Sequence, residues 1–120
     1  MPQLTLEFSS NLIEKDDLTT LFKQCHTILS ETLPTQLNSC KSRAIKCKCY
    51  VIGDGHPDNA FVHISLKVLA GRTLEKRNSL GEKMMETLKQ FFSDSINKLN
   101  LQITLEITEL QPTYFKYTSK

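Results

Sequence analysis

The sequence predicts a single α/β domain in which a four-stranded sheet carries two helices on one face. Four segments alternate apolar and polar residues, which is the period of a β-strand. Two longer segments repeat apolar residues every three or four positions, which is the period of an amphipathic helix. The order is strand, helix, strand, and then the same again. The chain is therefore interpreted as two tandem βαβ units, roughly residues 1–55 and 56–120, within one domain over 1–120.

The first half alternates over residues 3–8, which predicts a strand close to the N-terminus. An apolar stripe then starts at Leu18 and predicts a helix that either Asp16 or Asp17 can cap. Pro34 ends this helix, because proline lacks the N–H that a helix interior requires. A loop over residues 35–40 and a second alternating strand over residues 41–51 are expected to follow.

The second half begins after residues 53–58, which are dense in turn-forming types. Residues 60–70 are rich in apolar and β-branched side chains and predict a third strand. Thr73 is placed to cap a long helix that is expected to continue to Leu99. A fourth strand is predicted over residues 101–107, followed by a C-terminal tail.

One face of the sheet is expected to lie uncovered, because both helices belong on the other face. Five residues of the predicted strand over 41–51 share a side: Arg43, Ile45, Cys47, Cys49 and Val51. Several residues of the third strand add to the apolar character on both sides. Such a face is too apolar for water, so we expect other copies of the chain to cover it in an oligomer.

The composition fits a globular domain, with 39% hydrophobic and 23% charged residues. A net charge of +2 with interspersed signs gives no argument for a nucleic-acid partner. No apolar run approaches the ~20 residues that span a bilayer, so no membrane partner is expected. The N-terminal residues lack a secretory pattern, which favours a cytoplasmic location. Cys47 and Cys49 lack the spacing and the second pair of a zinc site, so no metal is expected.

Three stretches carry a resemblance to a known family: Met1-Pro2, residues 60–77 and residues 105–113. Together they resemble the 5-carboxymethyl-2-hydroxymuconate isomerases of the tautomerase superfamily, in order and spacing over nearly the whole chain. The resemblance implies a tautomerase-like fold, a homotrimer and an isomerase that needs no cofactor. It also implies that an amino-terminal proline moves protons on unsaturated keto or enol dicarboxylates.

Pro2 is the candidate catalytic base. A small second residue permits removal of the initiator methionine, which exposes a secondary amine at the start of a buried strand. Desolvation lowers the pKa of an amine, and nearby guanidinium groups act in the same direction. A base that titrates near neutral pH suits proton transfer beside a carbonyl. The simpler interpretation is that Pro2 merely follows the start codon, and the sequence leaves open whether Met1 is removed.

Arg72, Lys41 and Arg43 are the candidate substrate-binding residues. Arg72 follows the third strand, and its planar fork suits a carboxylate or an enolate oxygen. A family arginine at this point is a proposed active-site residue, whereas the simpler alternative is a solvated side chain. A weaker match covers Lys41-Ser42-Arg43, where the family has Arg-Ser-Arg. Lysine keeps the charge but loses the fork, which puts the substrate in doubt, and Arg43 could serve a subunit interface instead.

Two readings without catalysis stay open. A four-stranded sheet with two helices also describes many RNA-binding domains, and the strand over 41–48 is basic. No pair of exposed aromatic residues is spaced along a central strand for base stacking, which argues against this reading. The other alternative is a trimeric binding or interaction module that keeps the fold but has lost the activity.

Overall fold

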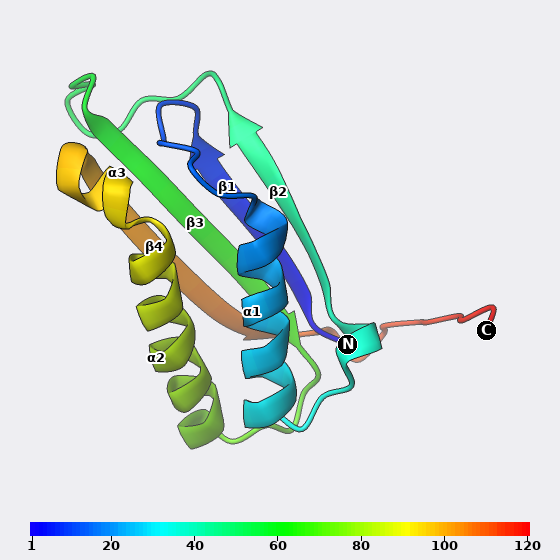
Figure 1. Ribbon diagram of the computed structural model, residues 1–120. Helices are drawn as coiled ribbons and strands as arrows, with labels where there is room; N and C mark the ends of the chain where they lie inside the picture. Colours follow the sequence, from blue (N-terminus) through cyan, green and yellow to red (C-terminus); the bar gives the residue numbers. More distant parts are fainter.

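The computed structural model describes all residues from 1 to 120 (Figure 1). Its elements, in chain order, are β1 (Gln3–Ser9), α1 (Leu18–Thr32), the short 3₁₀ helix η1 (Leu37–Ser39), β2 (Lys41–Cys47), β3 (Asn59–Val68), α2 (Leu74–Phe91), α3 (Ser93–Lys98) and β4 (Asn100–Glu109). The two predicted βαβ units are therefore present in the expected order.

The four strands form one sheet in the order β2-β1-β3-β4. Strand β1 runs parallel to β2, and β3 runs parallel to β4, as the crossover helices require. The two halves meet through β1 and β3, which are antiparallel. Because of this antiparallel pairing, the starts of β1 and β2 lie at the same end of the sheet as the finishes of β3 and β4.

Helices α1 and α2 lie side by side across one face of the sheet (Figure 1). Alternate strand residues point into the layer between sheet and helices, where the apolar stripes of both helices meet them. The largest fully buried side chains of this core are Leu4, Leu6, Leu21, Leu29, Leu33, Val62, Ile64, Leu66, Val68, Leu80, Met84 and Leu88. Burial of this apolar surface is the main favourable contribution to folding.

The predicted helix caps are confirmed. The Asp17 carboxylate accepts a hydrogen bond from the Thr19 N–H at 2.9 Å, and this interaction lowers the pKa of Asp17. The Thr73 hydroxyl accepts one from the Lys76 N–H at 3.1 Å. The single long helix expected up to Leu99 is wrong, because the chain leaves helical geometry at the buried residue Phe92 and resumes as α3.

Strand β2 ends at Cys47, which corrects the longer strand expected over 41–51. Its only neighbour is β1, and the last residue pair of their ladder joins Ser9 to Cys47. Beyond that pair no strand is present to accept further hydrogen bonds, so Cys49 and Val51 lie outside the sheet.

The uncovered face of the sheet is mainly polar, so the apolar face expected from the sequence is wrong. The buried apolar residues of β3 alternate toward the helices, while Phe61, His63 and Ser65 point to the open side. The ring nitrogen Nδ1 of His63 lies 2.6 Å from the Thr104 hydroxyl of β4 on this side. Among the strand residues there, Ile45 is the large aliphatic one, and it is 49% exposed.

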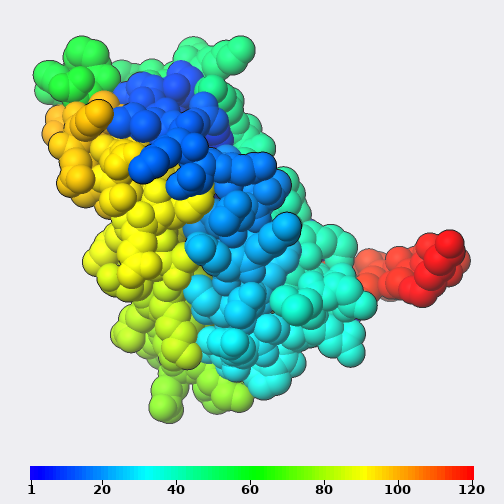
Figure 2. All heavy atoms as spheres, in the orientation of Figure 1, coloured from blue at the N-terminus to red at the C-terminus, as the bar shows by residue number.

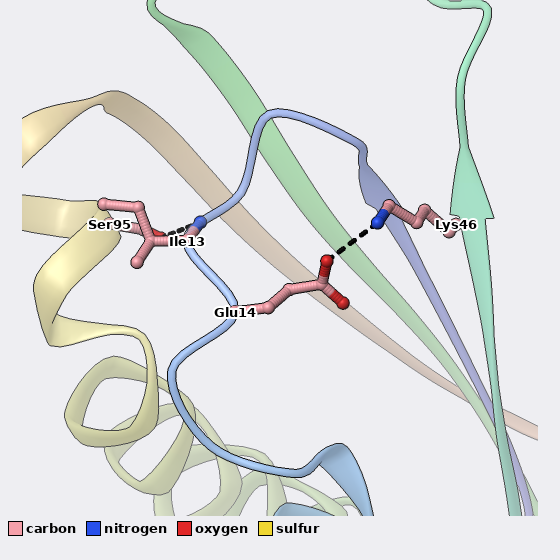
Figure 3. A network of polar contacts seen from close by, with 4 residues as sticks. All are labelled: Ile13, Glu14, Lys46 and Ser95. Carbon is pink, nitrogen blue, oxygen red and sulfur yellow. Dashed lines mark hydrogen bonds and ion pairs between the residues drawn. The ribbon is translucent and has the colours of Figure 1, made fainter.

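The connection between β1 and α1 lies at the end of the sheet opposite to Pro2 and is held there by two contacts (Figure 3). The backbone N–H of Ile13 donates to the Ser95 hydroxyl of α3 at 2.9 Å. The Glu14 carboxylate pairs with the Lys46 ammonium of β2 at 2.8 Å. These contacts fix the loop at the end of the sheet opposite to Pro2.

Candidate active site

Pro2 lies at the end of the sheet where the two halves of the chain meet. It is buried, and its carbonyl accepts a hydrogen bond from the Lys41 N–H at 3.1 Å. The next residue, Gln3, pairs with Lys41 on one side and with Lys67 of β3 on the other. Pro2 is therefore fixed between the start of β2 and the end of β3.

Arg72 comes to the same end because β3 finishes there. The turn after β3 passes through Gly71, which has a φ of 100° and donates its N–H to Glu109 Oε2 at 3.0 Å. A residue with a side chain is strained at this φ. Arg72 follows, half-buried, and its Nε atom is buried without a hydrogen-bond partner. Buried donors of this kind usually have a partner, so the Arg72 guanidinium has hydrogen-bonding capacity that the chain itself does not use.

The amino group at this end lies in a positive environment. Partial burial lowers the pKa of the Met1 α-amine below its ordinary 8.0, and the charge of Lys116 lowers it further. Arg72 and Lys41 act in the same direction, whereas Cys40 opposes them. Both physical causes favour the neutral, basic form of an amine at this place.

Lys41 is exposed beside Pro2, and its ammonium donates to the Ser39 carbonyl at 3.3 Å. It lines a hollow of about 710 Å³ together with the C-terminal tail. Cys40, its neighbour, is buried, and burial raises the pKa of its thiol. The Cys40 thiol is therefore held in its protonated form.

Arg43 lies on the open face of the sheet, two residues after Lys41 along β2. Its Nη1 donates to Gln3 Oε1 at 2.6 Å, and Gln3 Nε2 donates to the Tyr114 hydroxyl at 3.4 Å. Arg43 lines a separate hollow of about 690 Å³ with Ser65 and other residues of this face. The structure thus brings Pro2, Lys41 and Arg72 to one end of the sheet, while Gln3 engages Arg43.

Sequence reasoning missed Lys116 and Cys40. Cys40 reaches the site through the parallel pairing of β1 with β2, and Lys116 reaches it because β1 and β3 are antiparallel, which places the residues after β4 next to the N-terminus. No periodicity in the sequence indicates that pairing. The structure has no group of three or more His, Cys, Asp or Glu residues that could hold a metal ion. None of its helices has the length and apolar composition needed to cross a bilayer.

Neither Pro2 nor Arg72 lines any of the five main hollows of the isolated chain. The end of the sheet around them is shallow in a single subunit. A ligand held here would need further walls to exclude water.

The double βαβ sheet, with its helices on one face and a proline at the start of an inner strand, defines the tautomerase class of fold. The family model of 5-carboxymethyl-2-hydroxymuconate isomerase matches residues 2–119. The 5-carboxymethyl-2-hydroxymuconate Delta-isomerase of Escherichia coli is 36% identical over 113 residues, which cover 94% of this chain and 90% of the relative.

Solved structures agree with this result. A 5-carboxymethyl-2-hydroxymuconate isomerase from Deinococcus radiodurans R1 superposes with a TM-score of 0.88 at 27% identity, over 98% of this chain and 90% of that one. A fused 4-OT crystallised as a symmetric trimer has the same fold, with a TM-score of 0.72 at 16% identity, over 98% and 92%. The chain belongs to the 5-carboxymethyl-2-hydroxymuconate isomerase family, and it is an isomerase.

Proposed function

We propose that this isomerase is a keto–enol tautomerase in which the nitrogen of Pro2 is the base. The substrate class is an unsaturated 2-hydroxy or 2-oxo carboxylate similar to 5-carboxymethyl-2-hydroxymuconate. The proposal is carried by one juxtaposition: the start of β1 and the unpartnered guanidinium of Arg72 lie at the same end of the sheet.

The reaction begins with proton removal. While Met1 is attached, the Pro2 nitrogen is an amide and has no basicity, so the proposal requires loss of Met1. The exposed secondary amine then stands near the cations that lower the pKa of the Met1 amine. It takes a proton from the hydroxyl of an enol, or from the carbon beside a ketone, and returns it at a conjugated carbon.

Arg72 and Lys41 handle the negative charge. The substrate carboxylate binds the Arg72 guanidinium through paired N–H donors, and the enolate-like oxygen is stabilised by the same group of cations. Proton transfer between oxygen and carbon within the substrate changes no oxidation state of the enzyme and uses no additional reactant. Arg43 lies two residues further along β2 and is assigned a secondary binding or interface role.

A homotrimer supplies what the single subunit lacks. Strands β2 and β4 are the unpaired edges of the sheet, and the face opposite to the helices is uncovered. Phe115 and Tyr117 of the tail are 90% and 89% exposed, which is costly for large aromatic side chains. The symmetric trimer of fused 4-OT supports the same assembly for this chain. Neighbouring subunits would then wall the shallow site around Pro2.

The test combines two measurements on protein purified from its own source. Intact mass determines whether Met1 is absent, and ultraviolet absorbance follows ketonisation of phenylenolpyruvate and of 2-hydroxymuconate. The proposal expects loss of Met1 and turnover of at least one substrate. Retained Met1 with no turnover of either would overturn it and favour an interaction module with this fold.

A further inference from the structure

The C-terminal tail returns to the N-terminus, and this return suggests a role for it. The Leu110 N–H donates to the Val68 carbonyl at 2.8 Å, which holds the tail against the end of β3. Tyr114 then accepts the hydrogen bond from Gln3, next to Pro2. Two residues later, the Lys116 ammonium lies 3.0 Å from Met1 Sδ. The last residues stand clear of the body (Figure 2), so the tail is anchored up to Lys116 rather than along its whole length.

The contact between Lys116 and Met1 is chemically weak. A thioether sulfur is a poor acceptor for an ammonium, which prefers a carboxylate. Lys116 belongs to none of the three ion pairs of the chain. Removal of Met1 takes the sulfur away, and the ammonium is then left beside Pro2 without this contact.

The surroundings of Lys116 are suited to an anion. The hollow of about 710 Å³ that it lines also contains Lys41 and Lys120, and no Asp or Glu contributes to its lining. The charge of Arg72, which follows β3, acts on the Met1 amino group in the same direction as that of Lys116. Lys41 of β2 and Lys116 of the tail thus line one hollow that has no Asp or Glu side chain, although the carboxylate that ends the chain is borne by Lys120 of the same hollow.

We propose that Lys116 is a substrate-binding residue that holds a second carboxylate of the substrate at the Pro2 site, and that Tyr114 positions it. The inference rests on the proposed tautomerase function. Arg72 binds the carboxylate next to the reacting carbons, and Lys116 binds the one at the other end of the molecule. A substrate with one carboxylate gains nothing from Lys116, so this residue makes the site selective for diacids.

The test compares Lys116→Gln with the wild-type chain on two substrates. 2-Hydroxymuconate has two carboxylates and phenylenolpyruvate has one. We expect Lys116→Gln to raise KM for 2-hydroxymuconate by about tenfold, the effect of losing one hydrogen bond to a charged group, with KM for phenylenolpyruvate nearly unchanged. Lys116→Arg keeps the charge and should restore most of the affinity. Rates are compared on the pH plateau of each variant, so that a changed pKa of the base does not enter.

Lys98→Gln is the matched control, because Lys98 is an exposed lysine at the end of α3, at the other end of the sheet from Pro2. It should leave both KM values unchanged. An equal effect of Lys116→Gln on both substrates, or an equal effect of Lys98→Gln, would overturn the role of Lys116. If Lys116→Gln changes neither KM in an active enzyme, the role of Lys116 is also overturned, whereas the proposed tautomerase function is left intact. A wild-type chain that turns over neither substrate would overturn both proposals.

Discussion

The backbone carbonyl of Pro2 accepts a hydrogen bond from the Lys41 N–H, with 3.1 Å between nitrogen and oxygen. Lys41 is the first residue of β2, so this contact lies at the very start of the parallel β1–β2 ladder. It fixes Pro2 through its carbonyl oxygen rather than through its nitrogen. The same contact joins Pro2 to the first residue of β2, and the charge of Lys41 is one of those that lower the pKa of the Met1 amine.

Arg72 is expected to be essential for turnover. Substitution Arg72→Gln removes the guanidinium that we propose binds carboxylate and enolate, so kcat/KM should fall by at least about 100-fold on both substrates. Arg77→Gln is the control: Arg77 is also half-buried with an unpartnered Nε, but it lies on α2 beside Leu105. A loss in Arg77→Gln as large as that in Arg72→Gln would remove the special role of Arg72. Size-exclusion chromatography of both variants checks that assembly is retained.

Lys41 occupies a position at which the family that the chain resembles has arginine. A substitution can test whether the lysine weakens substrate binding. Lys41→Arg should lower KM several-fold, because the planar guanidinium of arginine binds a carboxylate through two hydrogen bonds. Lys41→Gln should raise KM by about tenfold through loss of the charge. Lys46→Gln serves as control, since Lys46 lies at the other end of β2 and pairs with Glu14. Identical steady-state kinetics for all three variants would exclude Lys41 from the site.

The amino group at this end should titrate below its ordinary range. In chain that keeps Met1, burial and then Lys116 lower the pKa of the α-amine below 8.0. The neutral form is thus present at lower pH than in an unfolded chain, and the Lys116→Gln substitution should move its titration to higher pH. The rate of N-terminal acylation measured against pH gives this titration. Cys40, Lys41 and Arg72 also face the amine, so only a partial return toward 8.0 is expected. A titration unchanged by Lys116→Gln, or lowered by it, contradicts this electrostatic description.

Much of the fold follows from local pattern. The caps at Asp17 and Thr73 lie where the sequence places them, because a side-chain oxygen before an apolar stripe satisfies the free N–H groups of a first turn. The break at Phe92 could not be predicted in this way. The apolar stripe continues through it, and the kink depends on how Phe92 packs in the core.

The candidate site is less predictable than the fold. Pro2, Arg72 and Lys41 could be chosen from residue type, position and resemblance, and the parallel β1–β2 pairing that joins Lys41 to Pro2 follows from the βαβ pattern. The approach of Arg72 depends instead on the pairing of β1 with β3. That pairing joins residues more than sixty positions apart, as in the pair of Gln3 with Lys67, and it leaves no periodic signal. Lys116 is invisible to sequence reasoning for the same reason, since the tail has neither helical nor strand periodicity.

We have proposed that the Pro2 nitrogen is the base. The most direct measurement is kcat of Pro2→Ala against the wild-type chain, with intact mass showing that both lack Met1. Alanine keeps an amino terminus but replaces the rigid secondary amine with a freely rotating primary one. We predict that kcat falls by at least about 100-fold, the usual contribution of a positioned base, while the oligomeric state stays that of the wild-type chain. An unchanged kcat in Pro2→Ala would contradict the proposal and assign the proton transfer to another group.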